Sequence, residues 1–81
     1  MNRDEFYEKF RTYIKEIVQE SSLDFNEDEE LINIGINSFE MVQVIVYVES
    51  IIGSEIPIEE YTFDYFKTMK TIYEKLIQYK F

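Results

Sequence analysis

Residues 38–52 constrain the fold more than any other part of this chain of 81 residues, because they are apolar on nearly every side. The longest unbroken apolar run lies inside this segment, from Val44 to Val48, and is far shorter than the ~20 residues needed to cross a bilayer. A short helix that is apolar almost all round has to be covered by other elements. The segment therefore predicts a helix packed into the single core of a small all-α domain.

Placing these residues at about 100° per position separates the predicted helix into faces. The arc expected to face the core holds Met41, Val44, Ile45, Val48 and Ile52. The polar side holds Glu40, Gln43, Tyr47 and Ser50. Phe39, Val42 and Val46 fall outside the core arc, on the flank next to Ser38. Exposed apolar residues at that flank would make a docking surface, whereas a bundle that covers the helix on two sides would make them core.

Weaker patterns predict the remaining elements. Residues 3–20 read as an amphipathic helix with Asn2 and Glu5 at capping-box spacing. Residues 21–37 read as a long loop in which Gly35 supplies a positive φ or a close backbone approach, and Asn37 with Glu40 caps the next helix. Pro57 bars a helix after Gly53, residues 61–66 read as one or two helical turns, and Thr68 caps a last helix. Its inward stripe is Met69, Ile72, Tyr73, Leu76 and Ile77.

The charge is concentrated in the middle of the chain. Residues 21–60 carry ten acidic residues and no Lys or Arg, which accounts for nearly all of the net charge of −9. Such a field repels nucleic acid and anionic lipid headgroups and attracts basic protein surfaces. An acidic surface can also have no role beyond keeping a protein soluble. A stretch of forty residues without Lys or Arg favours the interpretation that it attracts a basic partner.

Several kinds of catalytic site are excluded by residue type, whereas counting residues does not exclude paired carboxylates, although nothing pairs them with a cleft. The chain has no histidine and no cysteine, so Ser38 has no base to activate it, and Met41 stands where a Ser-x-x-Lys arrangement needs lysine. Two glycines are too few for a phosphate loop. Residues 24–28 match the first positions of a calcium loop, but Glu29 replaces its glycine and Gly35 its last ligand. We expect no specific metal site, and keep weak divalent-ion binding by residues 24–30 as a minor alternative.

One motif remains. The stretch Leu31-Ile32-Asn33-Ile34-Gly35-Ile36-Asn37-Ser38 resembles the Leu-x-x-x-Gly-x-Asp-Ser signature of acyl and peptidyl carrier proteins. The resemblance extends to the apolar helix that follows, to Glu49 near its end, and to Ile56-Pro57. It implies a small all-α, four-helix bundle over residues 1–81, with a long loop between helices I and II and a short helix III. It also implies a 4′-phosphopantetheine group on Ser38, with Asn37 and Gly35 in the same motif.

The resemblance further implies a function. The chain would be a non-catalytic carrier that holds an acyl or aminoacyl group as a thioester and delivers it in a biosynthetic pathway. Its partners would be a phosphopantetheinyl transferase, an adenylating ligase or acyltransferase, and downstream condensing or transfer enzymes. They would dock on Phe39, Glu40, Val42, Val46 and Glu49. We expect a free-standing protein, since Met1 lies close to the first helix and the chain ends within the last one. The N-terminus does not lead into the apolar segment of a signal peptide, so we also expect a cytoplasmic location, and we expect a monomer.

Three departures from the family pattern indicate which carriers of the family the chain resembles most. Asn37 replaces the usual aspartate, Phe39 the commoner leucine, and Gln43 the acid of many fatty-acid carriers. The pair Ser38-Phe39 and the segment 57–61 look more like those of D-alanyl and stand-alone peptidyl carriers than those of fatty-acid synthase carriers. The chain lacks alanine and is rich in Tyr and Phe, so we expect a short cargo that stays largely outside the bundle. The competing interpretation is an acidic helical interaction module without a prosthetic group, in which Ser38 is structural.

Overall fold

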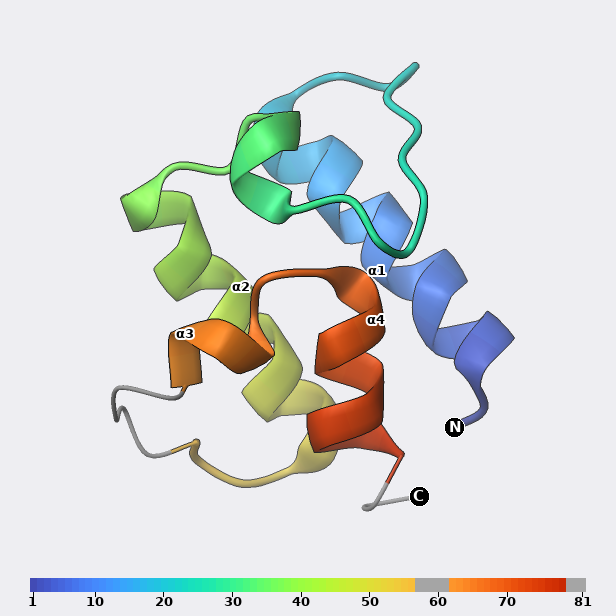
Figure 1. Cartoon of the computed structure of the whole chain (residues 1–81), viewed down its shortest axis with the longest axis vertical. Helices are drawn as coiled ribbons and strands as arrows, with labels where there is room; N and C mark the ends of the chain where they lie inside the picture. Colours follow the sequence, from blue (N-terminus) through green and yellow to red (C-terminus); the bar gives the residue numbers. More distant parts are fainter. Residues whose placement is uncertain (57–61, 79–81) are drawn as a thin grey trace.

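The computed structural model describes residues 1–56 and 62–78, and over these residues the chain is all-helical, without strands. Two long helices, α1 (Arg3–Val18) and α2 (Ser38–Ile52), are joined by a connection that contains a 3₁₀ turn, η1 (Leu31–Ile34). A short helix, α3 (Thr62–Tyr65), precedes α4 (Met69–Ile72), which continues as a π-helical segment, η2 (Tyr73–Ile77). Figure 1 shows α3 beside α2 and η1 above the start of α2. The predicted all-α class is confirmed, while the predictions for Pro57 and for the start of the turn at residue 61 lie outside the described residues.

Helix α1 begins at its predicted cap and ends earlier than predicted. The Asn2 side chain accepts a hydrogen bond from the Glu5 backbone N–H at 2.8 Å. The helix was expected to reach residue 20 but stops at Val18, because Gln19 takes a left-handed conformation with φ 56°. The backbone N–H of Gln19 then bonds carbonyls of the last turn. The inward face carries Phe6, Tyr7, Phe10 and Ile14.

Helix α2 has the predicted bounds because both of its ends are set by local residues. Asn37 and Glu40 form a complete capping box, and Gly53 ends the helix with a positive φ of 76°. Val44, Ile45 and Val48 are buried, whereas Met41 and Ile52 are half-buried and pack against the core. The placement of Tyr47 on the polar side is wrong: its ring is half-buried and stacks on Tyr13 of α1.

The connection from α1 to α2 is more ordered than the predicted loop. Leu31 is fully buried and starts η1, and Gly35 ends this turn with the predicted positive φ, 107°. Backbone hydrogen bonds tie the connection to the start of α4 and to the segment before it: Leu31 donates to the Lys67 carbonyl at 2.9 Å and Lys70 of α4 to the Glu27 carbonyl at 3.1 Å. These bonds hold η1 opposite the residues that follow α3.

The last helix begins where the sequence predicts. The Thr68 side chain accepts from the Thr71 N–H at 3.0 Å, and the Thr71 hydroxyl in turn accepts from the Thr68 N–H at 3.1 Å. Met69, Ile72 and Ile77 are buried in the core, and the Tyr73 ring lies 6.1 Å from those of Phe6 and Tyr7 in α1. The change from α to π winding after Ile72 was not predicted, since the apolar spacing alone does not distinguish the two.

Candidate functional site

Ser38 stands exposed at the first position of α2. The residue before it, Asn37, is held on both sides by Glu40: its N–H donates to Glu40 Oε1 at 3.0 Å, and its Oδ1 accepts from the Glu40 N–H at 2.8 Å. This closed cap fixes the start of the helix. The Ser38 hydroxyl is therefore presented at the positive end of a fifteen-residue helix dipole, a position that favours a phosphate group.

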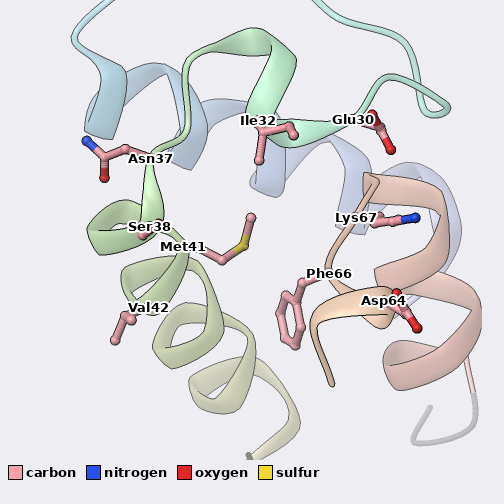
Figure 2. A pocket seen from close by; sticks show the side chains of 9 residues that line it. All are labelled: Glu30, Ile32, Asn37, Ser38, Met41, Val42, Asp64, Phe66 and Lys67. Atoms are coloured by element: carbon pink, nitrogen blue, oxygen red, sulfur yellow. The ribbon is translucent and has the colours of Figure 1, made fainter. Parts of the chain in front are cut away.

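A hollow of about 500 Å³ opens beside Ser38, and we call it the Ser38 hollow. Its size falls within the range of small-molecule sites, roughly 300–1,000 Å³. Figure 2 shows Ile32, Met41 and Phe66 pointing toward the space between η1, α2 and α3. The full lining is Glu30, Ile32, Asn37, Ser38, Met41, Val42, Asp64, Phe66 and Lys67.

The walls of the Ser38 hollow come from segments far apart in the chain. One wall is the first turn of α2, another is η1 with Glu30 before it, and the third is the end of α3 with Phe66 and Lys67. An isolated antiparallel bridge pairs Glu30 with Thr68, and the Lys70 ammonium lies 3.9 Å from Glu27 and 3.7 Å from Asp28. The second and third walls are thus joined through their backbones.

The interior of the Ser38 hollow is apolar and its charged groups stand at its edge. Phe66 is fully buried, Met41 is half-buried and Ile32 is 67% exposed. The side chains of Asp64 and Lys67 point away from the space between the helices in Figure 2. Such a site offers an apolar surface within reach of the Ser38 hydroxyl and supplies no group for acid–base chemistry inside it.

Exposed apolar side chains gather near this site. The large hydrophobic residues that are exposed among those described are Ile32, Phe39 at 74%, Val42 at 55% and Val46 at 57%. All lie on η1 or α2. The prediction that Phe39, Val42 and Val46 lie off the core face is confirmed.

The predicted site residues are only partly brought together. Ser38, Asn37 and Val42 line the hollow, with Gly35 shortly before them and Phe39 on the adjoining surface. Glu49 lies near the far end of α2, where its Oε2 accepts a hydrogen bond from the Ile56 N–H at 2.6 Å. Sequence reasoning missed Ile32, which stood in a predicted loop, and Phe66, whose place opposite α2 depends on tertiary contacts.

Comparison with known families identifies the family of the chain. A family model described as "Phosphopantetheine attachment site" matches residues 8–76, which is most of the chain and includes all the walls of the Ser38 hollow. The chain belongs to this phosphopantetheine-binding family, and its prosthetic group is a covalently attached 4′-phosphopantetheine. Carrier domains of this kind generally interact with phosphopantetheinyl transferases and with the enzymes that load or process cargo. No curated protein and no solved structure matched the chain.

The residues present fit this prosthetic group. An exposed serine hydroxyl on a helix N-terminus can carry a phosphodiester, and the apolar Ser38 hollow lies next to it. Over residues 1–56 and 62–78, no cluster of three or more His, Cys, Asp or Glu side chains is arranged to hold a metal ion. None of the described helices is long and apolar enough to span a membrane.

Proposed function

We propose that Ser38 carries the 4′-phosphopantetheine arm. The observation that supports this assignment most directly is the position of its exposed hydroxyl, at the capped start of α2 and on the edge of an apolar hollow. Asn37 supports the site by capping the helix, and Gly35 by taking the positive φ that turns the chain into it. When attached, the arm supplies a terminal thiol that holds cargo as a thioester, so the chain itself needs no catalytic group.

In this proposal the chain is a non-catalytic acyl or aminoacyl carrier, a cytoplasmic monomer acting in a biosynthetic pathway. Residues 1–81 form a single carrier domain of four helices, in which α3 is the short third helix and α4 with η2 forms the fourth. A phosphopantetheinyl transferase modifies it, an adenylating ligase or acyltransferase loads it, and condensing or transfer enzymes receive the cargo. The family match supports the general role, and the absence of histidine and cysteine supports the lack of catalysis.

The proposed docking surface for these enzymes surrounds Ser38. Phe39, Val42 and Val46 supply apolar contact, because each has more than half of its surface exposed on α2. Glu40 and Glu49 add negative charge in a region of the chain that has no base. Their carboxylates also serve the fold, Glu40 in the capping box and Glu49 at the Ile56 N–H, so they steer partners from fixed positions.

The cargo in this proposal is short and stays outside the core. The interior of the domain is filled by fully buried side chains such as Val44, Val48 and Phe66, the last of which lines the Ser38 hollow. Close-packed interiors resist added volume, and overpacking typically costs about 1–3 kcal/mol. A short acyl or aminoacyl group can occupy the hollow itself, which is bordered by exposed Ile32 and Val42, without displacing those side chains.

Covalent modification is the direct test. Incubation of the chain with a broad-specificity phosphopantetheinyl transferase, coenzyme A and Mg²⁺ should add one phosphopantetheine, as read by intact mass and by peptide mapping to Ser38. Ser38→Ala should gain none and keep its helical circular dichroism. Ser54→Ala, which changes another exposed serine beyond the end of α2, is the matched control and should be modified normally. Modification at another serine, or none with several transferases, would contradict the assignment of Ser38.

The competing function is an acidic interaction module without a prosthetic group. Protein purified from its native host distinguishes the two functions. Its intact mass should show the arm in the carrier case and the bare chain in the other. The exposed apolar surface of α2 would serve either role, so the mass decides between them.

A further inference from the structure

Two tyrosines join α1 to α2. The rings of Tyr13, from α1, and Tyr47, from α2, are stacked with an interplanar angle of 7° and centroids 4.0 Å apart. The Tyr13 hydroxyl donates to the Gln43 carbonyl at 3.1 Å, and the Tyr47 hydroxyl donates to the Lys9 carbonyl at 3.4 Å. Each side chain is therefore fixed to the backbone of the opposite helix. We call this pair the tyrosine wall.

Two surface hollows share the tyrosine wall. The first, of about 430 Å³, is the apolar hollow, and the residues that complete it are Phe39, Val42, Gln43, Val46 and Ser50. The second, of about 410 Å³, is the acidic hollow, and the residues that complete it are Glu5, Glu8, Lys9, Thr12 and Glu16. An apolar site and a charged site thus meet at one rigid pair of rings.

The acidic hollow carries an unbalanced charge. Three carboxylates, from Glu5, Glu8 and Glu16, face one ammonium group, that of Lys9. The ion pairs found among residues 1–56 and 62–78 involve none of these four side chains. Clefts lined by one sign of charge concentrate groups of the opposite sign, so this hollow favours a cation.

We propose that the two hollows together dock a protein segment in which an aliphatic side chain stands next to an arginine or lysine. The aliphatic group covers Phe39 and Val46, which are 74% and 57% exposed, and the cation meets the carboxylates of α1. The apolar half rests on the proposed function, because it belongs to the docking surface on α2. The new element is the α1 half, which makes the docking surface two-sided and selects partners by a cation placed beyond the tyrosine wall.

Charge complementarity also identifies the occupant as a different protein. A second copy docked through the same face would bring its own acidic hollow to the interface, where Lys9 is the one base among the lining residues. Like charges placed opposite one another across an interface oppose association. Nucleic acid and anionic membrane surfaces are repelled for the same reason.

The test uses a defined probe and the isotope-labelled full chain. The probe is a blocked, alanine-based helical peptide with leucines along one face and arginines on the adjoining face, and the control peptide has glutamates in place of the arginines. The arginine peptide should shift amide signals on both sides of the tyrosine wall, around residues 9–16 and 39–47, with an affinity that falls as salt is added. The glutamate peptide should not bind.

Charge-reversal variants test the α1 half directly. Glu8→Lys and Glu16→Lys should each weaken binding of the arginine peptide by about threefold, as expected for exposed ion pairs. Glu55→Lys makes the same change of charge at an exposed residue that lines neither hollow, and should leave the affinity unchanged. Shifts confined to α2, equal binding of both peptides, or equal weakening by Glu55→Lys would overturn the proposal. Phosphopantetheine transfer to Ser38, measured by mass on the same samples, reports on the proposed function independently.

Discussion

At the scale of single residues, Tyr7 stands out because its hydroxyl is buried. The residue is 6% exposed, and its hydroxyl oxygen has no hydrogen-bond partner within residues 1–56 and 62–78. The ring itself is well placed, with Tyr73 in an edge contact at 6.1 Å and the Arg11 guanidinium 5.6 Å from its centroid. Tyr7 therefore contributes through its ring, whereas desolvation of its hydroxyl opposes folding.

Replacing Tyr7 by phenylalanine should stabilise the protein. The change keeps the ring and removes an unsatisfied polar group, whose burial costs about 1–3 kcal/mol. We expect a gain of about 1 kcal/mol in the free energy of unfolding, measured by urea denaturation. Tyr13→Phe is the matched control, because it removes a hydroxyl that donates a hydrogen bond, and it should not stabilise. A Tyr7→Phe protein less stable than the parent would show that this hydroxyl has a partner in solution.

Asn37 combines a structural and a proposed functional role. Asn37→Ala removes the acceptor for the Glu40 N–H and should lower the free energy of unfolding by about 1 kcal/mol. Denaturant unfolding measures this change. Asn37→Asp keeps that acceptor and restores the aspartate of the family signature. It should therefore leave phosphopantetheine transfer intact or faster, as read by the rate of mass gain. Slower transfer to the aspartate variant would indicate that its transferase reads the asparagine.

At the scale of elements, the interface between α1 and α2 depends on neutral tyrosines. Burial raises the pKa of Tyr13 above its ordinary value of 10.0, with a smaller effect from the nearby Glu16 carboxylate. Burial likewise raises the pKa of Tyr47, to which Tyr13 and Glu16 add. Both hydroxyls also donate to carbonyls across the interface and lose these bonds on ionisation.

The pH dependence of stability follows from the direction of these shifts. A group whose pKa is higher in the folded state binds its proton more tightly there, so its contribution is complete below pH 10 and is lost as pH rises through the folded-state pKa. We expect the melting temperature to fall above pH 10. The double variant Tyr13→Phe, Tyr47→Phe should show a shallower fall. An unchanged alkaline slope in the double variant would place the effect elsewhere, with Tyr7, whose pKa burial also raises, as the next residue to change.

The elements also show which parts of the structure the sequence predicts. The bounds of α2 follow from Asn37, Glu40 and Gly53, because caps act within a few residues of the helix ends. The Ser38 hollow cannot be predicted from the sequence in the same way. Its far wall is held by the hydrogen bond from Leu31 to Lys67, which joins two segments that share no sequence periodicity. Tyr47 was misplaced because a helical angle ignores the reach of a long aromatic side chain across to the neighbouring helix.

At the scale of the whole molecule, the acidic middle of the chain and the exposed α2 surface should act differently on partners. Steering by charge changes the association rate and weakens with salt, whereas apolar anchors mainly change dissociation. Ten acidic residues over 21–60 provide the field, and Val46 is one anchor. Loading of Ser38 by a transferase can separate the two contributions.

Val46→Asp should slow loading at every salt concentration, while Glu40→Lys should slow it most at low salt. Val46 is 57% exposed, so the aspartate variant should keep its circular dichroism and melting temperature. Glu40→Gln keeps an acceptor for the Asn37 N–H and removes only the charge, which controls for loss of the cap. Loading by Glu40→Gln that is independent of salt and equal to the parent rate would exclude steering by this residue. An unfolded Val46→Asp protein would exclude docking by Val46.

The backbone ties between η1 and the segment before α4 also bear on how such a chain diversifies. The spacing between η1 and the residues that follow α3 is held by main-chain hydrogen bonds, so it does not depend on which side chains line these two walls. Ile32 and Val42 are more than half exposed, and substitutions at exposed positions usually change stability by less than about 0.5 kcal/mol. In the proposed carrier role, exchange of these two residues should change the cargo preference and keep the fold. New specificity can then arise at two exposed lining residues, while the buried and capping residues of the same lining keep the fold.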